Sequence, residues 1–262
     1  SSFTFKVSDG TSWSNGTYET KMNIIAVADE PTVTVNLKSS ITIDDTNVTD
    51  TSGGYKVSAF DTRGNPTTIS VVSNTSHDGF GVSGASSGDS VEIGYNSRSK
   101  SSEELRVSFT NDVSKVDVSF AWKHAGETAL IKFYRDGILV GTQSHKGGSD
   151  TVDAPVTFAV ASGVAFDEIR FSAPGIEDDY LIHSISFTEV EADDKGKIIG
   201  YLYDVDLSAA LVDTDGSETL TVKISGVPVG ATFDSTDIVD KGAGVWELTI
   251  PSGSTSIDDT FK

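Results

Sequence analysis

The sequence predicts an all-β protein, and three observations support that prediction. Apolar residues alternate with polar ones through most of the chain, which is typical of strands with one buried face. Turn residues separate these stretches, and Asp136-Gly137 stands between two of them as a tight hairpin turn. No segment of helical length repeats its apolar residues with the period of a helix. The clearest alternating stretches are Phe3–Val7, Val33–Leu37, Val116–Trp122, Leu220–Ile224 and Trp246–Ile250.

The order of strands and turns divides the chain into three blocks. Residues 1–37 hold a few strands and run through a linker-like junction into Pro31. Residues 38–190 form a longer series that includes a hairpin of Ala129–Arg135 and Ile138–Thr142. Residues 191–262 return to short alternating stretches. Short strands at regular spacing favour β-sandwiches.

The charge of the chain excludes several classes of partner. The formal net charge is −20, from 39 Asp and Glu against 19 Lys and Arg. A chain this acidic repels phosphate backbones and anionic lipid, which argues against binding nucleic acid or a membrane surface. No apolar run is long enough to span a bilayer. The absence of cysteine excludes disulfides, zinc–thiolate sites and thiol nucleophiles.

Acidic residues gather in the predicted turns, and this pattern favours calcium. Ca²⁺ prefers carboxylate and carbonyl oxygens, and carboxylates at alternate turn positions can point at one ion. The alternative is that each cluster is a solvated acidic turn. The predicted calcium ligands are Asp29, Asp89, Glu92, Glu103, Asp178, Asp179, Asp213, Asp215 and Glu218.

The two outer blocks carry a resemblance to a known family. The segment 206–233 closely resembles the repeats of giant RTX-type bacterial adhesins, which are immunoglobulin-like extender modules exported by type I secretion. The segments 3–10 and 27–35 resemble the last strands of one such module and the first strand of the next. In that family the second strand follows the first closely, whereas here a long segment intervenes. The resemblance therefore implies an immunoglobulin-like β-sandwich, residues 1–37 plus 191–262, split by an inserted domain, residues 38–190.

If the outer segments complete one another, they share one core. On that interpretation Phe3, Phe5, Ile24 and Val33 pack with the strands of the last block. Those strands contribute Leu220, Val222, Ile224 and Trp246.

The middle block resembles the jelly-roll ligand-binding domains of the same adhesins. The segments that carry this resemblance are 79–94, 103–109, 166–175 and 178–187. Some of those domains are calcium-dependent peptide binders that capture a carboxyl terminus. The resemblance implies a secreted fragment at the bacterial cell surface that attaches to a peptide on another cell, lies beside further immunoglobulin-like repeats, and is monomeric as a fragment.

The ligand itself has alternatives. A calcium ion with an open coordination position attracts a carboxylate or a sugar diol. Tyr95, Phe80 and Tyr180 are the candidate aromatic contacts, although an aromatic residue in a strand more often belongs to the core. A peptide is the first choice, a calcium-dependent glycan-binding module is the second, and a purely structural extender segment stiffened by calcium is the third.

The sequence argues against an enzyme. Gly84–Gly88 matches G-x-S-x-G, but that motif needs a strand before it and a helix after it. None of the four histidines has a partner at zinc-ligand spacing. Adjacent carboxylates such as Asp178 and Asp179 point to opposite faces of a strand, unlike the paired acids of a glycosidase. We therefore predict a binding protein.

Overall fold

We describe the protein from a computed structural model, which covers residues 2–5, 18–21, 31–38, 40–73, 77–84, 90–212, 219–227 and 229–262. These residues form strands and no helix, which confirms the predicted all-β class. Nothing within them is therefore a helix long and apolar enough to cross a membrane. The chain divides into two compact units, described separately below. The terminal unit comprises Ser1–Asn36 with Val205–Lys262, and the central unit is Leu37–Asp204.

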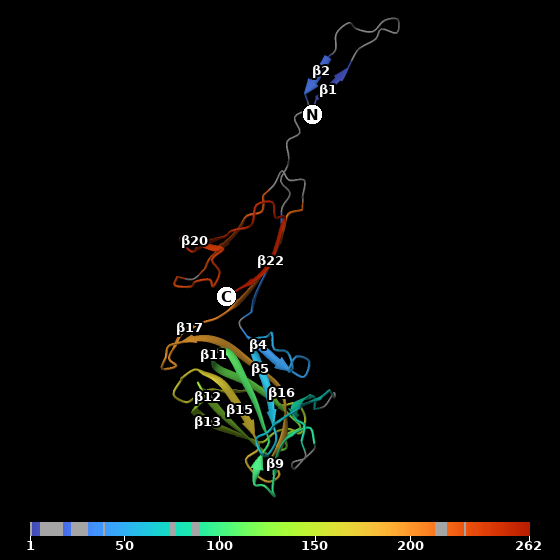
Figure 1. The fold of residues 1–262 in the computed structure, drawn as a ribbon, viewed down its shortest axis with the longest axis vertical. Helices are drawn as coiled ribbons and strands as arrows, with labels where there is room; N and C mark the ends of the chain where they lie inside the picture. Colours follow the sequence, from blue (N-terminus) through green and yellow to red (C-terminus); the bar gives the residue numbers. More distant parts are fainter. Residues whose placement is uncertain are drawn as a thin grey trace. The chain divides into compact units, whose positions relative to one another are not determined.

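The central unit is built from one large sheet that folds over a common core (Figure 1). Its strands are β4 (Ile41–Asp44), β5 (Tyr55–Phe60), β6 (Pro66–Thr67), β7 (Ile69–Val72), β8 (Gly79–Val82), β9 (Ile93–Asn96), β10 (Ser101–Ser102), β11 (Glu104–Ala121), β12 (Thr128–Arg135), β13 (Ile138–Lys146), β14 (Val156–Phe158), β15 (Phe166–Ser172), β16 (Asp179–Ala192) and β17 (Ile198–Tyr201).

The long strand β11 joins the two layers of this sandwich. Its first half pairs with β5 and β15, and its second half pairs with β14 and β16. The ladder with β16 shifts register between Val113 and Val116, where one extra residue is inserted into β11. A bulge of this kind bends a strand. The sequence resolves 103–109 and 116–122 as two strands, and the structure shows that they are one bent strand.

Alternation along the strands builds the core. Leu105, Val107 and Phe109 of β11 are buried, and the residues between them are partly exposed. Phe171 of β15 lies opposite Leu105 in the ladder and is also buried. Burial of apolar surface on this scale is the main stabilising contribution to a domain of this size.

The predicted hairpin is confirmed. Strands β12 and β13 pair antiparallel through the Asp136-Gly137 turn. Both turn residues have positive φ, 50° for Asp136 and 75° for Gly137, as a type I′ turn requires. An Asp followed by Gly tolerates this conformation better than most pairs.

The predicted boundary between residues 190 and 191 falls inside β16. Val190 of this strand pairs with Tyr201 of β17, which keeps the segment up to Asp204 in the central unit. The strand pairing of the sheet, which the local sequence pattern does not reveal, moves the boundary toward the C-terminus.

The described strands of the terminal unit form small sheets. β18 (Asp204–Ala210) lies between β22 (Ser256–Phe261) and β3 (Thr32–Lys38). β21 (Val245–Leu248) lies between β19 (Val222–Ser225) and β20 (Ile238–Gly242). β1 (Ser2–Phe5) pairs with β2 (Tyr18–Lys21).

The core of the terminal unit corrects one expectation. Its buried residues Leu207, Leu220, Val222 and Phe261 all come from the C-terminal segment. Val33 is 56% exposed, because β3 is an edge strand whose side chains are exposed on both faces. Val33 therefore does not share this core. The expectations for the side chains of Phe3 and Phe5, and for Ile24, lie outside what the structure describes.

Candidate functional site

Three loops of the central unit meet at one end of the sandwich. They are the β11–β12 loop (122–127), the β13–β14 loop (147–155) and the β15–β16 loop (173–178). The Gly147 N–H donates to the carbonyl of Glu127 at 2.9 Å, and the Asp150 N–H donates to the carbonyl of Lys123 at 3.1 Å. The Thr128 N–H donates to Asp178 Oδ1 at 2.8 Å. We call this region, with Lys123, Glu127, Asp153, Asp178 and Asp179, the acidic loop end.

A buried lysine stands at the centre of the acidic loop end. Lys123 is 0% exposed, and its Nζ donates to the carbonyl of Gly147. Burial lowers the pKa of this ammonium group, while the nearby carboxylates of Asp153, Glu127 and Asp178 act in the opposite direction. One positive charge therefore faces several carboxylates.

The carboxyl groups of Glu127 and Asp179 lie close enough for each to influence the pKa of the other. Glu127 is 8% exposed, and its Oε2 also accepts the His124 N–H at 2.6 Å. Burial raises the pKa of Glu127 to about 7, and burial likewise raises the pKa of Asp179. Two carboxyl groups held this close in a desolvated place retain a shared proton, or attract a cation in its place.

Glu103 and Asp179 lie on either side of the same residue of β9, Gly94. Asp179 of β16 pairs with Gly94 of β9, and the Glu103 N–H donates to the carbonyl of Gly94 at 2.9 Å on the other side. The Gly94 N–H in turn donates to Glu103 Oε2 at 3.1 Å. Glu92 directly precedes β9. Glu92 is 4% and Glu103 2% exposed. The structure thus places Asp178 and Asp179 together at the start of β16, with Glu103 across β9 from Asp179.

Two of the three aromatic candidates are corrected. Phe80 and Tyr180 are both 0% exposed and belong to the core, so neither ring offers a face to a ligand. The Tyr180 hydroxyl donates to the carbonyl of Ser172 at 3.0 Å, and its ring meets Phe120 edge-on. Tyr95 is only partly buried on β9 and remains accessible.

The other predicted ligands, Asp29, Asp89, Asp213, Asp215 and Glu218, lie outside the described residues. Within the ranges that the structure describes, no group of three or more His, Asp or Glu side chains is arranged to hold a metal ion. A metal at the acidic loop end would therefore take further oxygen ligands from the backbone, from water or from a bound ligand.

Sequence reasoning missed Glu127, Lys123 and Asp153. Asp153 Oδ1 accepts the Ser149 N–H at 2.8 Å, and its Oδ2 is buried without a hydrogen-bond partner among the described residues. Glu127 has a usable signal, because it is an acidic residue directly before the β12 strand pattern. Lys123 has none, since its burial depends on three loops that are distant in the sequence.

A glycine holds these loops together, and this leads to a prediction. A Cβ on Gly148 would lie 2.0 Å from the carbonyl oxygen of Lys123, so Gly148→Ala must displace backbone. We expect this variant to lose about 1–2 kcal/mol of unfolding free energy. The matched control is Gly126→Ala in the neighbouring loop, where an added Cβ meets nothing within 4 Å. Equal urea midpoints for the two variants would contradict the prediction.

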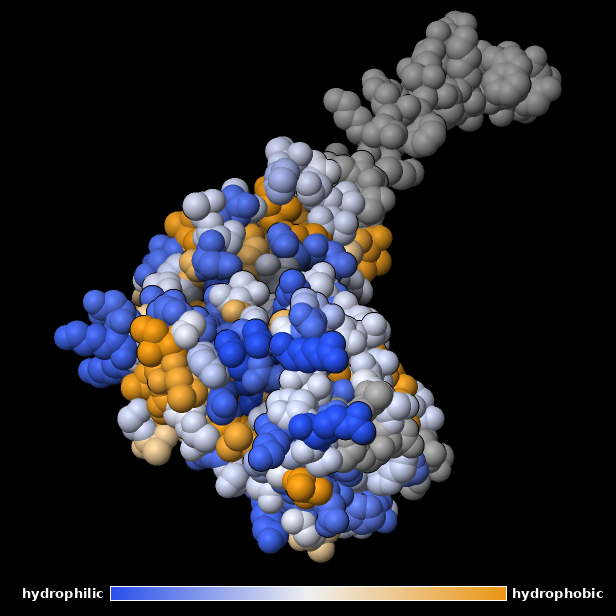
Figure 2. Space-filling model, turned by 60° about the horizontal axis from the view of Figure 1, so that its bottom comes forward, coloured by the Kyte–Doolittle hydropathy of each residue, from blue (hydrophilic) through white to orange (hydrophobic). Residues whose placement is uncertain are grey.

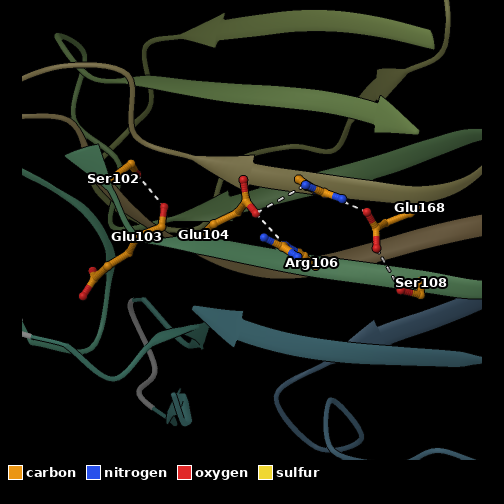
Figure 3. A network of polar contacts seen from close by, with 7 residues as sticks. Ser102, Glu103, Glu104, Arg106, Ser108 and Glu168 are labelled. Atoms are coloured by element: carbon orange, nitrogen blue, oxygen red, sulfur yellow. Dashed lines mark hydrogen bonds and ion pairs between the residues drawn. The ribbon is translucent and has the colours of Figure 1, made fainter. Parts of the chain in front are cut away.

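A second polar cluster lies on the outer face of the sheet, on strands β11 and β15. Glu104 Oε1 accepts from Arg106 Nε at 2.5 Å, and Glu168 accepts from Arg170 Nε at 2.6 Å and from Ser108 at 3.2 Å (Figure 3). Glu103 points away from this row. The guanidinium groups of Arg106 and Arg170 also stack on aromatic rings, each 3.8 Å from the ring centroid. The positive and negative charges of this cluster are paired with each other. We therefore interpret the cluster as stabilising the sheet and not as a binding site.

The surface seen in Figure 2 is largely hydrophilic, with apolar residues in small separate areas. No protein-family model matches the chain, and no curated protein matches it.

Proposed function

We propose that the chain is an extracellular adhesin fragment that mediates calcium-dependent attachment. The central unit is the ligand-binding jelly roll, and the terminal unit is the immunoglobulin-like module that carries it on a bacterial surface after type I secretion. The ligand is a peptide on a host or partner cell, bound through its terminal carboxylate. The proposal assigns no catalytic residue.

The observation that carries the proposal is the buried Glu127 carboxyl group beside Asp179 at the acidic loop end. Their raised pKa values mean that two negative charges at this place are costly when calcium is absent. A divalent cation would replace the shared proton and remove that cost. The two carboxyl groups leave coordination positions open, and a carboxylate from the ligand is a donor that Ca²⁺ prefers.

The placement of the pair is also suitable for binding. It lies where three loops end, and binding residues commonly sit on loops held by a rigid scaffold. Asp178 adds negative charge next to Asp179 and is held there by the Thr128 N–H. The net charge of −20 gives a cation a further reason to bind.

The experiment is a binding screen of the full chain against a library of carboxyl-terminal peptides and a glycan array, each with calcium and with EGTA. We expect peptide binding that EGTA abolishes and that is lost when the peptide terminus is amidated. Amidation removes the carboxylate while leaving the side chains unchanged, so it serves as the matched control. Binding that is indifferent to both treatments would contradict the proposal.

A further inference from the structure

A groove on the outer face of the central unit lies apart from the acidic loop end. It has a volume of about 390 Å³, within the range of small-molecule sites. It crosses four neighbouring strands in the order β14, β11, β16 and β17. Its lining residues are Ser114, Lys115, Ala159, Thr188, Tyr201 and Tyr203.

The register shift in β11 creates the floor of the groove. Val113 pairs with Glu189 and Val116 pairs with Phe187, so Ser114 and Lys115 together stand opposite Thr188. A bulge re-aims side chains and is common beside functional sites. Here it directs one hydroxyl and one ammonium group to the face that carries Thr188.

Two tyrosines form the wall. Tyr201 is 58% and Tyr203 is 42% exposed, so both side chains are accessible from solvent. Leu202 between them points to the other side, where it lines a small space with Phe187 and Ile41. The alternation places both rings on one face, and an open aromatic face is a stacking surface for the apolar side of a sugar ring.

The charge of the groove indicates what it takes. The chain has 39 acidic residues, yet none of them lines the groove, and Lys115 is its one charged lining residue. Rings, hydroxyl groups and an ammonium group complement a sugar that carries a carboxylate. We propose that this groove binds an acidic oligosaccharide, one bearing uronate or sialate carboxylates, independently of calcium.

This inference goes beyond the proposed function, because no lining carboxylate is available to hold calcium. The test uses the full chain in calcium-depleted buffer, with trigalacturonate and sialyllactose as acidic probes and maltotriose and lactose as neutral ones. Calorimetry is expected to show binding of at least one acidic probe in the millimolar range or tighter. Because peptide capture needs calcium, either activity can fail while the other succeeds.

Variants locate the binding. Tyr201→Ala and Tyr203→Ala are each expected to weaken it about tenfold through the loss of ring stacking. Lys115→Met should bring the acidic probe to the affinity of its neutral counterpart. Ile199→Ala is the matched control, because Ile199 is 59% exposed on the same strand but does not line the groove. No binding of either acidic probe, unchanged affinity in both tyrosine variants, or an equal loss in the Ile199 variant would each overturn the proposal.

Discussion

Millimolar calcium is expected to raise the Tm of the chain by about 5–10 °C over its value in EGTA. A ligand present at a hundredfold excess over its Kd, and bound only by the folded state, adds about 2.7 kcal/mol of stability. For a chain of this size each kcal/mol shifts Tm by about 2–4 °C. Scanning calorimetry or circular dichroism in the two buffers measures the shift.

Magnesium is the control ion for this prediction. It demands a tighter octahedral site and releases its water reluctantly, so an equal concentration should give a smaller shift. Superimposable melts in calcium and EGTA would contradict the prediction that calcium stabilises the folded chain.

The double variant Glu127→Gln with Asp179→Asn is expected to abolish most of the calcium shift contributed by the acidic loop end. It should also change how the calcium-free protein responds to pH. Because both folded-state pKa values are raised, the folded chain retains protons that the unfolded chain releases as pH rises. In EGTA, the contribution of this pair to the free energy of unfolding of the wild-type chain should therefore be greatest below about pH 4.5. It should fall as the pH rises toward about 7. The variant should lack that fall.

Asp150→Asn is the matched control for the double variant. Asp150 lies in the same loop end, but its side chain is 52% exposed and its contact is with His124 at 3.4 Å. Exposed pairs of this kind contribute little. If the double variant shows the same pH profile and the same calcium shift as the Asp150 variant, the pair of Glu127 and Asp179 has no special role.

Local patterns in the sequence were enough for the class of fold and for the β12–β13 hairpin. Both depend on neighbouring residues: alternation along a strand and the tolerance of Asp136-Gly137 for positive φ. The position of the boundary after β16 depends on which strands pair, and pairing joins residues distant in the sequence.

The candidate site was predictable only in part, for a similar reason. Asp178 and Asp179 could be identified from the sequence, because they are acidic residues at the start of a strand pattern. The residues from Tyr180 to Ile182 are all buried, so buried and exposed positions do not alternate there. The burial of Tyr180 therefore could not be predicted from an alternating pattern. Glu127 joins the site through its proximity to Asp179 at the start of β16, and no spacing in the sequence encodes that proximity.

The position of β18 between β3 and β22 has a mechanical consequence. Tension applied to the two ends of the chain would enter this sheet through β3 and β22, and both strands are hydrogen-bonded to β18. The central unit is the chain segment that connects β3 to β18. Because these two strands are hydrogen-bonded to each other, tension passes between them through those bonds and the central unit carries none of it. While that pairing holds, pulling on the chain would stretch the sheet and leave the loops around Glu127 and Asp179 undistorted.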